Sequence, residues 1–291
     1  MPVPVIAGLS RIAGAYEGVI VDLWGTLHDG LAPYPGAVEA LERLLAAGAR
    51  VAVLSNAPRR AGSVARAMHG IGFPADSGYH VFTSGEEAWR AVAERPDDWY
   101  REFGRRCYHM GPARDRGMLD NPGLEPVAEI GAADFVLCTG LARPEETVDD
   151  YQAALTAAAG RGMPMVCANP DFVVMRGGTR ELCAGALARH YEGALGGRVR
   201  WHGKPHASVY ESCMALIGVA DPARVIMIGD SLRTDVAGAA ALGMATAFIP
   251  GGIHGDELGV AWGEVPPVAR LQAAFEADGV RPTTILPAFA W

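Results

Sequence analysis

The sequence predicts an α/β protein built on a doubly wound parallel sheet, with a second α/β unit inserted into it. Two patterns support this prediction. Short, continuous apolar runs rich in β-branched residues alternate with helical patterns near both ends of the chain. The middle of the chain has a similar alternation of its own, beyond a polar, proline-containing stretch at 94–98. Strands that are buried on both faces of a parallel sheet carry such runs, and helices connect them.

The apolar runs that we expect to form the first sheet end in a residue that leads into a loop or a helix. They cover residues 18–22, 50–55, 79–84, 224–230 and 245–249. Apolar side chains at helical spacing predict the intervening helices, at 37–47, 63–69 and 235–242. Gly48 and Gly243 end the first and the last of these helices. This alternation is typical of a doubly wound core.

The middle of the chain is predicted to be a separate unit. Apolar runs at 134–139 and 164–169 predict strands, and the patterns at 148–159 and 183–195 predict helices. The polar stretch at 94–98 is a plausible crossing point between domains. We therefore expect a core domain made of 1–96 and 204–291, with an inserted α/β domain at 97–203.

Composition excludes several classes of protein. The net charge of −8 and the pI near 5.5 argue against a general nucleic-acid binder, which would present a basic face. No apolar run is long enough to span a bilayer, and the start of the chain does not resemble a signal peptide. The five cysteines are scattered, without metal-type spacing, which fits buried thiols in a reducing compartment. We expect a cytoplasmic protein that binds neither nucleic acid nor membranes.

Lysine usage singles out one position. Lys204 is the only lysine, and every other permanently cationic side chain is arginine. The bias indicates that arginine serves wherever any cation is sufficient. Position 204 would then require a compact ammonium on a slim stem rather than a planar guanidinium. The alternative is the chance survival of one surface lysine.

Polar side chains end three of the predicted strands. Asp22, Ser55 and Asp230 would meet at the carboxyl edge of a parallel sheet, where α/β folds bind ligands. Carboxylates hold a hard cation through oxygen, while a hydroxyl, backbone amides and Lys204 suit phosphoryl oxygens. The sequence therefore predicts a site for a metal and a phosphate. As structural alternatives, Ser55 would only cap the next helix, and Asp235 would only complement a helix dipole.

Four short motifs in order along the chain resemble those of the haloacid dehalogenase (HAD) superfamily. They are Asp22-Leu-Trp-Gly-Thr-Leu27, Leu54-Ser-Asn56, Gly203-Lys-Pro205 and Gly229-Asp-Ser-Leu-Arg-Thr-Asp235. The large insert between the second and third motifs resembles class IIA, the NagD-like branch with a large α/β cap domain. So does the segment Ala168-Asn-Pro-Asp171 within that insert. The resemblance spans nearly the whole chain.

The resemblance implies a Mg²⁺-dependent phosphatase-type hydrolase that acts on a small phosphorylated metabolite. Asp22 would attack phosphorus and form an aspartyl-phosphate, which water hydrolyses. The residues implied to hold Mg²⁺ are Asp22, the backbone carbonyl of Trp24, Asp230 and Asp235. Those implied to contact the phosphate are Ser55, Asn56 and Lys204, and Asn169 and Asp171 would face the site from the cap. Caps of this class often contribute to dimers, which leaves a homodimer open.

The chain departs from the resemblance at Trp24, where most members have a second aspartate that acts as general acid. General acid–base help is worth ~10²–10⁴ in rate. Three hypotheses follow. The first is a phosphatase that needs little acid assistance or takes it from His28 or Asp29. The second is a HAD hydrolase acting on another bond, such as carbon–phosphorus, and the third is a phosphate-ligand binding or regulatory protein. Retention of the nucleophile and the metal-site residues favours the first two.

Overall fold

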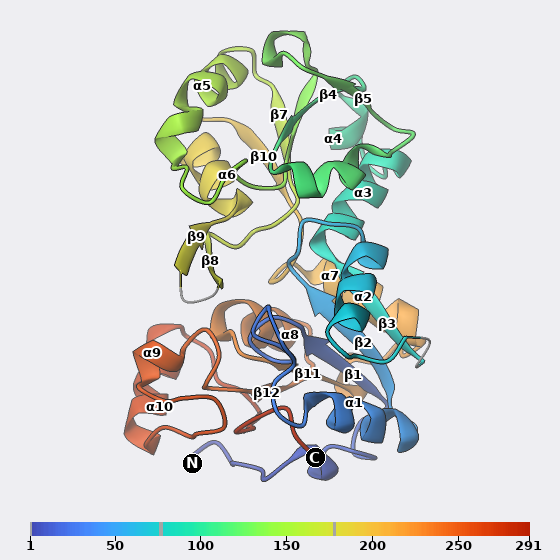
Figure 1. Cartoon of the computed structure of the whole chain (residues 1–291), viewed down its shortest axis with the longest axis vertical. Helices are drawn as coiled ribbons and strands as arrows, with labels where there is room; N and C mark the ends of the chain where they lie inside the picture. Colours follow the sequence, from blue (N-terminus) through green and yellow to red (C-terminus); the bar gives the residue numbers. More distant parts are fainter. Residues whose placement is uncertain (1, 76–77, 177–178) are drawn as a thin grey trace. The chain divides into compact units, whose positions relative to one another are not determined.

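The structure, a computed structural model, describes residues 2–75, 78–176 and 179–291. The chain forms two compact units (Figure 1). Unit 1 comprises Met1–Ser55, Ala65–Phe82 and Lys204–Trp291, and unit 2 comprises Asn56–Val64 and Thr83–Gly203. The chain therefore crosses between the units at four points. The boundaries expected at 97 and 204 stay a prediction, and the helix before residue 97 lies in unit 2.

Unit 1 is built on a six-stranded sheet in the order β13-β12-β11-β1-β2-β3. Its strands are β1 (Gly18–Asp22), β2 (Arg50–Ser55), β3 (Tyr79–Thr83), β11 (Val225–Gly229), β12 (Ala245–Phe248) and β13 (Thr284–Ile285). Strand β1 pairs in parallel with β2 and β11, and β12 pairs in parallel with β11 and β13. Every residue of β1 and β11 is buried, as expected of central strands covered on both faces. The predicted parallel α/β core is confirmed.

Helices connect these strands and supply the rest of the unit 1 core. They are α1 (Ala37–Ala46), α2 (Ala61–Gly70, which begins in unit 2), α7 (Ala207–Ile217), α8 (Ala237–Ala241), α9 (Gly255–Leu258) and α10 (Val268–Ala277). Short 3₁₀ turns lie at η1 (Leu9–Arg11) and η5 (Pro222–Arg224), and η6 (Leu232–Val236) is a π-helix. Val209 and Cys213 of α7 pack on Ile20, Leu54 and Met227 of the sheet. Helix α7 thereby anchors the segment that begins at Lys204.

Unit 2 has its own five-stranded sheet in the order β10-β7-β6-β4-β5. Its strands are β4 (Arg106–Met110), β5 (Glu125–Val127), β6 (Phe135–Cys138), β7 (Pro164–Cys167) and β10 (Arg198–Trp201), all paired in parallel. An antiparallel hairpin of β8 (Val173–Arg176) and β9 (Thr179–Leu182) stands apart from this sheet. The second α/β unit that the sequence predicts is therefore present.

Helices cover both faces of the unit 2 sheet (Figure 1). They are α3 (Ser84–Glu94), α4 (Asp98–Arg101), α5 (Gln152–Gly160) and α6 (Ala184–Gly193), with 3₁₀ turns η2 (Ala113–Leu119), η3 (Ile130–Ala132) and η4 (Val148–Tyr151). Alternate residues of β6 serve the two faces. Phe135 and Leu137 pack with residues of α3 and α4, whereas Val136 and Cys138 pack with residues of α5 and α6.

Local capping explains one difference from the predicted elements. The strand expected at 79–84 ends at Thr83 because Thr83 caps helix α3, its side chain accepting a hydrogen bond from Glu86 N (2.9 Å). The helix expected at 235–242 is divided into η6 and α8, and the one at 148–159 into η4 and α5. Within the ranges that the structure describes, no helix combines the length and apolar character needed to cross a membrane.

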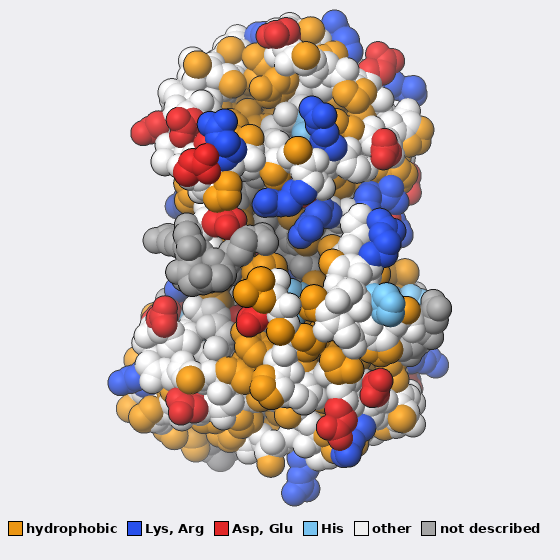
Figure 2. Space-filling view, viewed as in Figure 1, with side chains coloured by type: hydrophobic (Ala, Val, Ile, Leu, Met, Phe, Trp, Pro, Cys, Tyr) orange, Lys and Arg blue, Asp and Glu red, His pale blue; other side chains and the backbone are white. Residues whose placement is uncertain are grey.

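The surface carries charges of both signs among hydrophobic side chains, as Figure 2 shows for one face. Because Lys204 is only 3% exposed, the basic groups seen there are arginines. All five cysteines are buried, as the sequence predicts. The lone lysine is thus withdrawn from the surface, which removes the alternative of a surface lysine kept by chance.

Candidate functional site

Three polar side chains lie at one edge of the unit 1 sheet. Asp22 is the last residue of β1, Ser55 is the last residue of β2, and Asp230 directly follows β11. Because β1 pairs in parallel with both β2 and β11, these ends are adjacent. All three side chains are buried. The sheet therefore brings together the residues that the sequence places at its carboxyl edge.

Four charged residues form what we call the acidic pocket: Asp22, Lys204, Asp230 and Asp235. One carboxylate oxygen from each aspartate lies within 4.8 Å of the others. Lys204 Nζ donates to Asp22 Oδ1 and, at 2.7 Å, to Asp235 Oδ1. Burying an ammonium is costly unless it is paired, and these two contacts provide the pairing. Three carboxylates around one ammonium leave the pocket with an excess of negative charge.

Backbone groups orient two of these carboxylates. Asp235 lies in η6, and its Oδ2 accepts a hydrogen bond from Ser231 N at 3.0 Å. Ile253 N donates to Asp230 Oδ2 at 2.6 Å. The identity of the residues at 231 and 253 does not predict these hydrogen bonds, because the donor in each is a main-chain amide. Sequence reasoning therefore missed them.

Glycine is required where the chain passes Asp230. A Cβ at Gly25 would lie 2.1 Å from Asp230 Oδ2, and one at Gly252 would lie equally close. Gly25 also has φ +83°, a conformation that other residues rarely adopt. The first motif therefore needs a glycine three residues after Asp22, because the carboxylate of Asp230 occupies the space that a side chain would need.

Burial and mutual repulsion raise the pKa of two pocket carboxylates. Burial raises the pKa of Asp22 to about 7, against the lowering effect of Lys204. Burial, followed by the charges of Asp22 and Asp235, raises the pKa of Asp230 well above 3.8. Burial disfavours the charged form of Lys204, but the charges of Asp22 and Asp235 outweigh it and hold the lysine pKa well above 10.5. Raised carboxyl pKa values are typical of a site short of positive charge.

The donor set fits a hard divalent cation. Asp22 Oδ2 is buried and accepts no hydrogen bond from any residue that the structure describes. The carboxylate of Asp22 lies beside those of Asp230 and Asp235, and carboxylate oxygens are the ligands that Mg²⁺ prefers. The structure thus brings together the three aspartates proposed as metal ligands. Trp24, whose carbonyl is the fourth, lies two residues beyond Asp22 in the turn after β1.

The hairpin after Asp22 holds both residues that could replace the general acid. The ring of Trp24 packs edge-on against His28, with centroids 5.3 Å apart. Gly30 N donates to His28 Nδ1 at 2.7 Å, and burial lowers the pKa of His28 to about 4 despite the nearby Asp29. Asp29 accepts from the amides of residues 31 and 32, and these hydrogen bonds lower its pKa. At neutral pH, His28 is therefore uncharged and Asp29 is ionised, so neither is in the form of a strong proton donor.

Three other predicted residues form a hydrogen-bonded group within unit 2. Asn56 Nδ2 donates to Asp171 Oδ1 at 2.8 Å, and Asp171 N donates to Asn169 Oδ1 at 2.9 Å. Both asparagines are buried. The segment after Ser55 is thereby linked to the segment predicted as the substrate loop of the cap.

Comparison with known proteins gives consistent results. A family described as haloacid dehalogenase-like hydrolase matches residues 19–125, and a second, HAD hydrolase-like family matches 201–270. Chronophin of Homo sapiens is 30% identical over 259 residues, covering 85% of both chains. A haloacid dehalogenase-like hydrolase from Brucella suis is 34% identical, with a TM-score of 0.81 over 98% of this chain and 100% of that one.

A further solved structure is that of a glycerol phosphate phosphatase from Mycobacterium tuberculosis in complex with magnesium. It is 25% identical to this chain, with a TM-score of 0.69, and the match covers 94% of this chain and 75% of that one. The Brucella suis structure matches nearly the whole chain, and the two family matches include all four motifs at 22–27, 54–56, 203–205 and 229–235. The chain therefore belongs to the haloacid dehalogenase superfamily of hydrolases.

Proposed function

We propose that the protein is a Mg²⁺-dependent phosphatase that hydrolyses a small phosphorylated metabolite through Asp22. The observation that carries this proposal is the acidic pocket. It holds a buried carboxylate whose Oδ1 accepts from Lys204 and whose Oδ2 has no described hydrogen-bond donor, beside Asp230 and Asp235. The magnesium complex of the similar glycerol phosphate phosphatase supports the choice of metal.

The proposed reaction has two displacements at phosphorus. An oxygen of Asp22 attacks phosphorus, the ester P–O bond breaks, and the leaving oxygen departs and takes a proton from solvent. Water then attacks the aspartyl-phosphate, which releases inorganic phosphate and regenerates the carboxylate of Asp22. Lys204 orients Asp22 and supplies positive charge, and Ser55 and Asn56 donate hydrogen bonds to the phosphoryl oxygens. Bound Mg²⁺ supplies further charge neutralisation between the two anions.

The remaining expectations complete the proposal. Residues 97–203 act as the cap domain of the class, and Asn169 and Asp171 contact the substrate. The backbone carbonyl of Trp24 completes the metal ligands with Asp22, Asp230 and Asp235. The protein works in the cytoplasm, as a monomer or a homodimer.

Trp24 bears on which esters react fastest. Without an acid, the departing oxygen must carry negative charge in the transition state. The states of His28 and Asp29 support this view, because neither offers a proton readily at neutral pH. Aryl and acyl phosphates, whose leaving groups are stable as anions, are therefore the favoured substrates of the proposal.

Phosphate release from a small panel tests the function. The panel is 4-nitrophenyl phosphate, acetyl phosphate, glycerol phosphate and 2-aminoethylphosphonate, each with and without Mg²⁺, for the wild type and Asp22→Asn. We expect Mg²⁺-dependent release from the first two that Asp22→Asn abolishes. Release from the phosphonate alone would establish carbon–phosphorus cleavage instead. Phosphate binding without turnover of any ester would establish a binding protein.

A further inference from the structure

The residue before the lone lysine is held by a largely buried carboxylate of unit 2. Gly203 N donates to Glu87 Oε2 at 3.0 Å, and His202 Nδ1 lies 3.0 Å from the same oxygen. The other ring nitrogen of His202, Nε2, lies 2.5 Å from the hydroxyl of Tyr100. One carboxylate oxygen therefore contacts both residues that precede Lys204.

Burial makes these contacts mutually dependent. The Glu87 side chain is 11% exposed, and His202 and Tyr100 are 6% and 2% exposed. Buried polar groups are costly when they lose their partners. Burial also raises the pKa of Tyr100, so its phenol keeps its proton, and the hydroxyl lies within hydrogen-bond distance of His202 Nε2. Tyr100 thus contacts His202, and His202 contacts Glu87, so that the three polar side chains form one largely buried group within unit 2.

Close packing restrains Gly203 as well. Its φ is +108°, and a Cβ there would lie 2.6 Å from Asn56 Oδ1 and 2.8 Å from both Ser84 Cβ and Pro170 Cδ. We call this cluster the Gly203 junction: Asn56, Ser84, Glu87, Pro170, His202 and Gly203. It surrounds the peptide that leads into Lys204 with unit 2 atoms on several sides.

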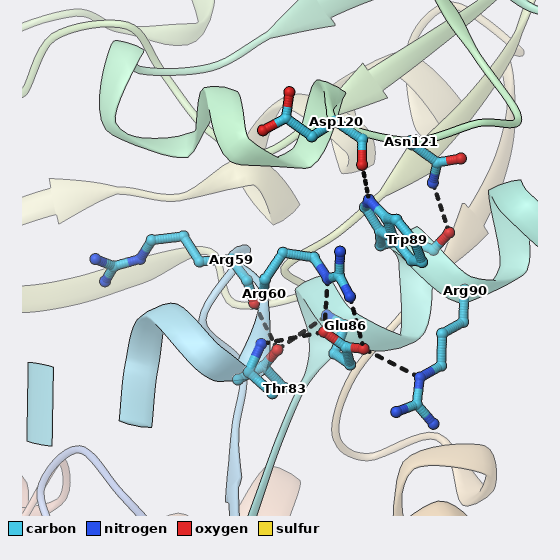
Figure 3. A network of polar contacts seen from close by, with 9 residues as sticks. Arg59, Arg60, Thr83, Glu86, Trp89, Arg90, Asp120 and Asn121 are labelled. Atoms are coloured by element: carbon cyan, nitrogen blue, oxygen red, sulfur yellow. Dashed lines mark hydrogen bonds and ion pairs between the residues drawn. The ribbon is translucent and has the colours of Figure 1, made fainter. Parts of the chain in front are cut away.

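Helix α3, which carries Glu87, is itself anchored at its N-terminus (Figure 3). Thr83 Oγ1 donates to Arg59 O at 2.5 Å. Glu86 accepts from Arg60 Nε at 2.7 Å and from Arg90 Nε at 3.1 Å, and in Figure 3 it lies between these two guanidinium groups. The carboxylate of Glu87 therefore projects from a helix whose position is fixed by its neighbours.

We propose that Glu87 is a positioning residue for Lys204. By holding Gly203 and His202 it fixes the peptide from which Lys204 extends, and so sets where the ammonium meets Asp22. This inference rests on the proposed function. The reason is geometric: misplacing a catalytic group by about 1 Å can cost about 10²-fold in rate. The chain has no second lysine to compensate.

A double-mutant cycle tests the proposal. Glu87→Ala is made in the wild type and in Lys204→Ala, and single-turnover rates with 4-nitrophenyl phosphate are measured at saturating Mg²⁺. A positioning role acts through Lys204, so the two changes should not be additive. We expect Glu87→Ala to slow the wild type by about tenfold or more and Lys204→Ala by less than about twofold. Glu94→Gln, at the exposed end of the same helix, is the matched control and should leave the rate unchanged.

The outcomes separate this inference from the proposed function. Equal losses in both backgrounds, or no loss in the wild type, would overturn the positioning role while the phosphatase stands. If the wild type released no phosphate from any ester, the proposed function itself would fail. Should Glu87→Ala lack a cooperative melting transition, Glu87→Gln takes its place, because it keeps the size and one acceptor. It should show a smaller loss with the same dependence on Lys204, and a loss independent of Lys204 would again overturn the proposal.

Discussion

Two buried carboxylates, one in each unit, show opposite electrostatics. Asp22 in the acidic pocket shares one ammonium with two other aspartates, and burial raises its pKa to about 7. Glu86 of α3 is also largely buried, but hydrogen bonds from Arg60, the amide of Ala61 and Arg90 outweigh burial and lower its pKa. The first carboxylate shares one cation with two other carboxylates, whereas the second contacts two guanidinium groups.

This difference distinguishes the acidic pocket, which can accept a ligand, from the contacts of Glu86, which stabilise the fold. A buried group with all its partners has nothing to gain from a further ion. The pocket instead keeps an oxygen of Asp22 without a described donor and leaves Asp230 with a raised pKa. Charge supplied from outside, as a divalent cation, would complete the pocket. Substitutions in the two places should consequently differ in their response to Mg²⁺.

The largest effect is expected for Asp22→Asn. Removal of the proposed nucleophile should lower turnover of 4-nitrophenyl phosphate by about 10⁴-fold or more. The melting temperature without metal should not fall, because the substitution relieves repulsion among three carboxylates. Lys204 keeps its hydrogen bond to Asp235 in this variant. Wild-type turnover in this variant would mean that Asp22 is not the nucleophile. Loss of folding would mean that the pocket is primarily structural.

Lys204→Arg should come next, with a loss of about 10²-fold although charge is conserved. The ammonium donates to two carboxylates inside a closed pocket, and a planar guanidinium is too wide to occupy the same place. Steady-state kinetics with 4-nitrophenyl phosphate would measure the loss. Arg43→Lys on the exposed face of α1 is the control for the exchange of one cation for another. Full activity in Lys204→Arg would show that any cation is sufficient.

Trp24→Asp should change selectivity more than rate. A carboxyl group two residues after Asp22 would supply an acid, worth up to ~10²-fold for an alkyl ester such as glycerol phosphate and little for an aryl ester. The wild type should accordingly depend steeply on leaving-group pKa, and the variant much less. Stability without metal needs a parallel melting measurement, because the variant adds charge near the pocket. A flat dependence in the wild type would show that another residue already acts as the acid.

Sequence patterns predicted the pocket better than the contacts that support it. Asp22 and Ser55 end strands with a continuous apolar run, and Asp230 follows another, so parallel pairing places them at one edge. Lys204 was predicted as a functional residue because it is the only lysine in the chain. The contact of Glu87 with Gly203 joins residues 116 apart and uses a main-chain amide, so no local pattern indicates it. A histidine at position 202 likewise has no distinguishing signal until Tyr100 and Glu87 are placed around it.

The edges of the sheets were also harder to predict than their centres. Strand β10, at the edge of the unit 2 sheet, reads Arg-Val-Arg-Trp and lacks the apolar run of a central strand. Strand β13 contributes two residues, too few for any periodicity. In both, the pairing is set by neighbouring strands rather than by local preference. The interior strands β1, β2, β6, β7, β11 and β12, whose burial on both faces dictates their composition, were predicted. The interior strand β4, which carries exposed and half-buried polar residues, was not, whereas the edge strand β3 was.

Asp230→Asn tests, by thermal stability, whether the acidic pocket binds Mg²⁺. Mg²⁺ at a hundredfold excess over its Kd should stabilise the wild type by about 2.7 kcal/mol, or roughly 5–10 °C in melting temperature. The variant should lose this shift but should melt no lower than the wild type without metal, because one of three clustered carboxylates is neutralised. Thermal melting with MgCl₂, and with NaCl at matched ionic strength as control, measures both. An undiminished shift in the variant would place the metal elsewhere.

Glu86→Gln is the counterpart in unit 2 and should give the smallest effect, about 1–3 kcal/mol, with no dependence on Mg²⁺. Because folding lowers the pKa of Glu86 below its ordinary 4.5, its contribution is complete above that value. The contribution is lost as the pH falls through the lower pKa of the folded state. The stability gap between wild type and Glu86→Gln should therefore be constant from neutral pH to about pH 5.5 and shrink below about pH 4.5. Denaturant titrations across this range measure the gap. A gap that widened with acid, or one that Mg²⁺ removed, would place Glu86 in the same electrostatic class as Asp22 and end the distinction between the two regions.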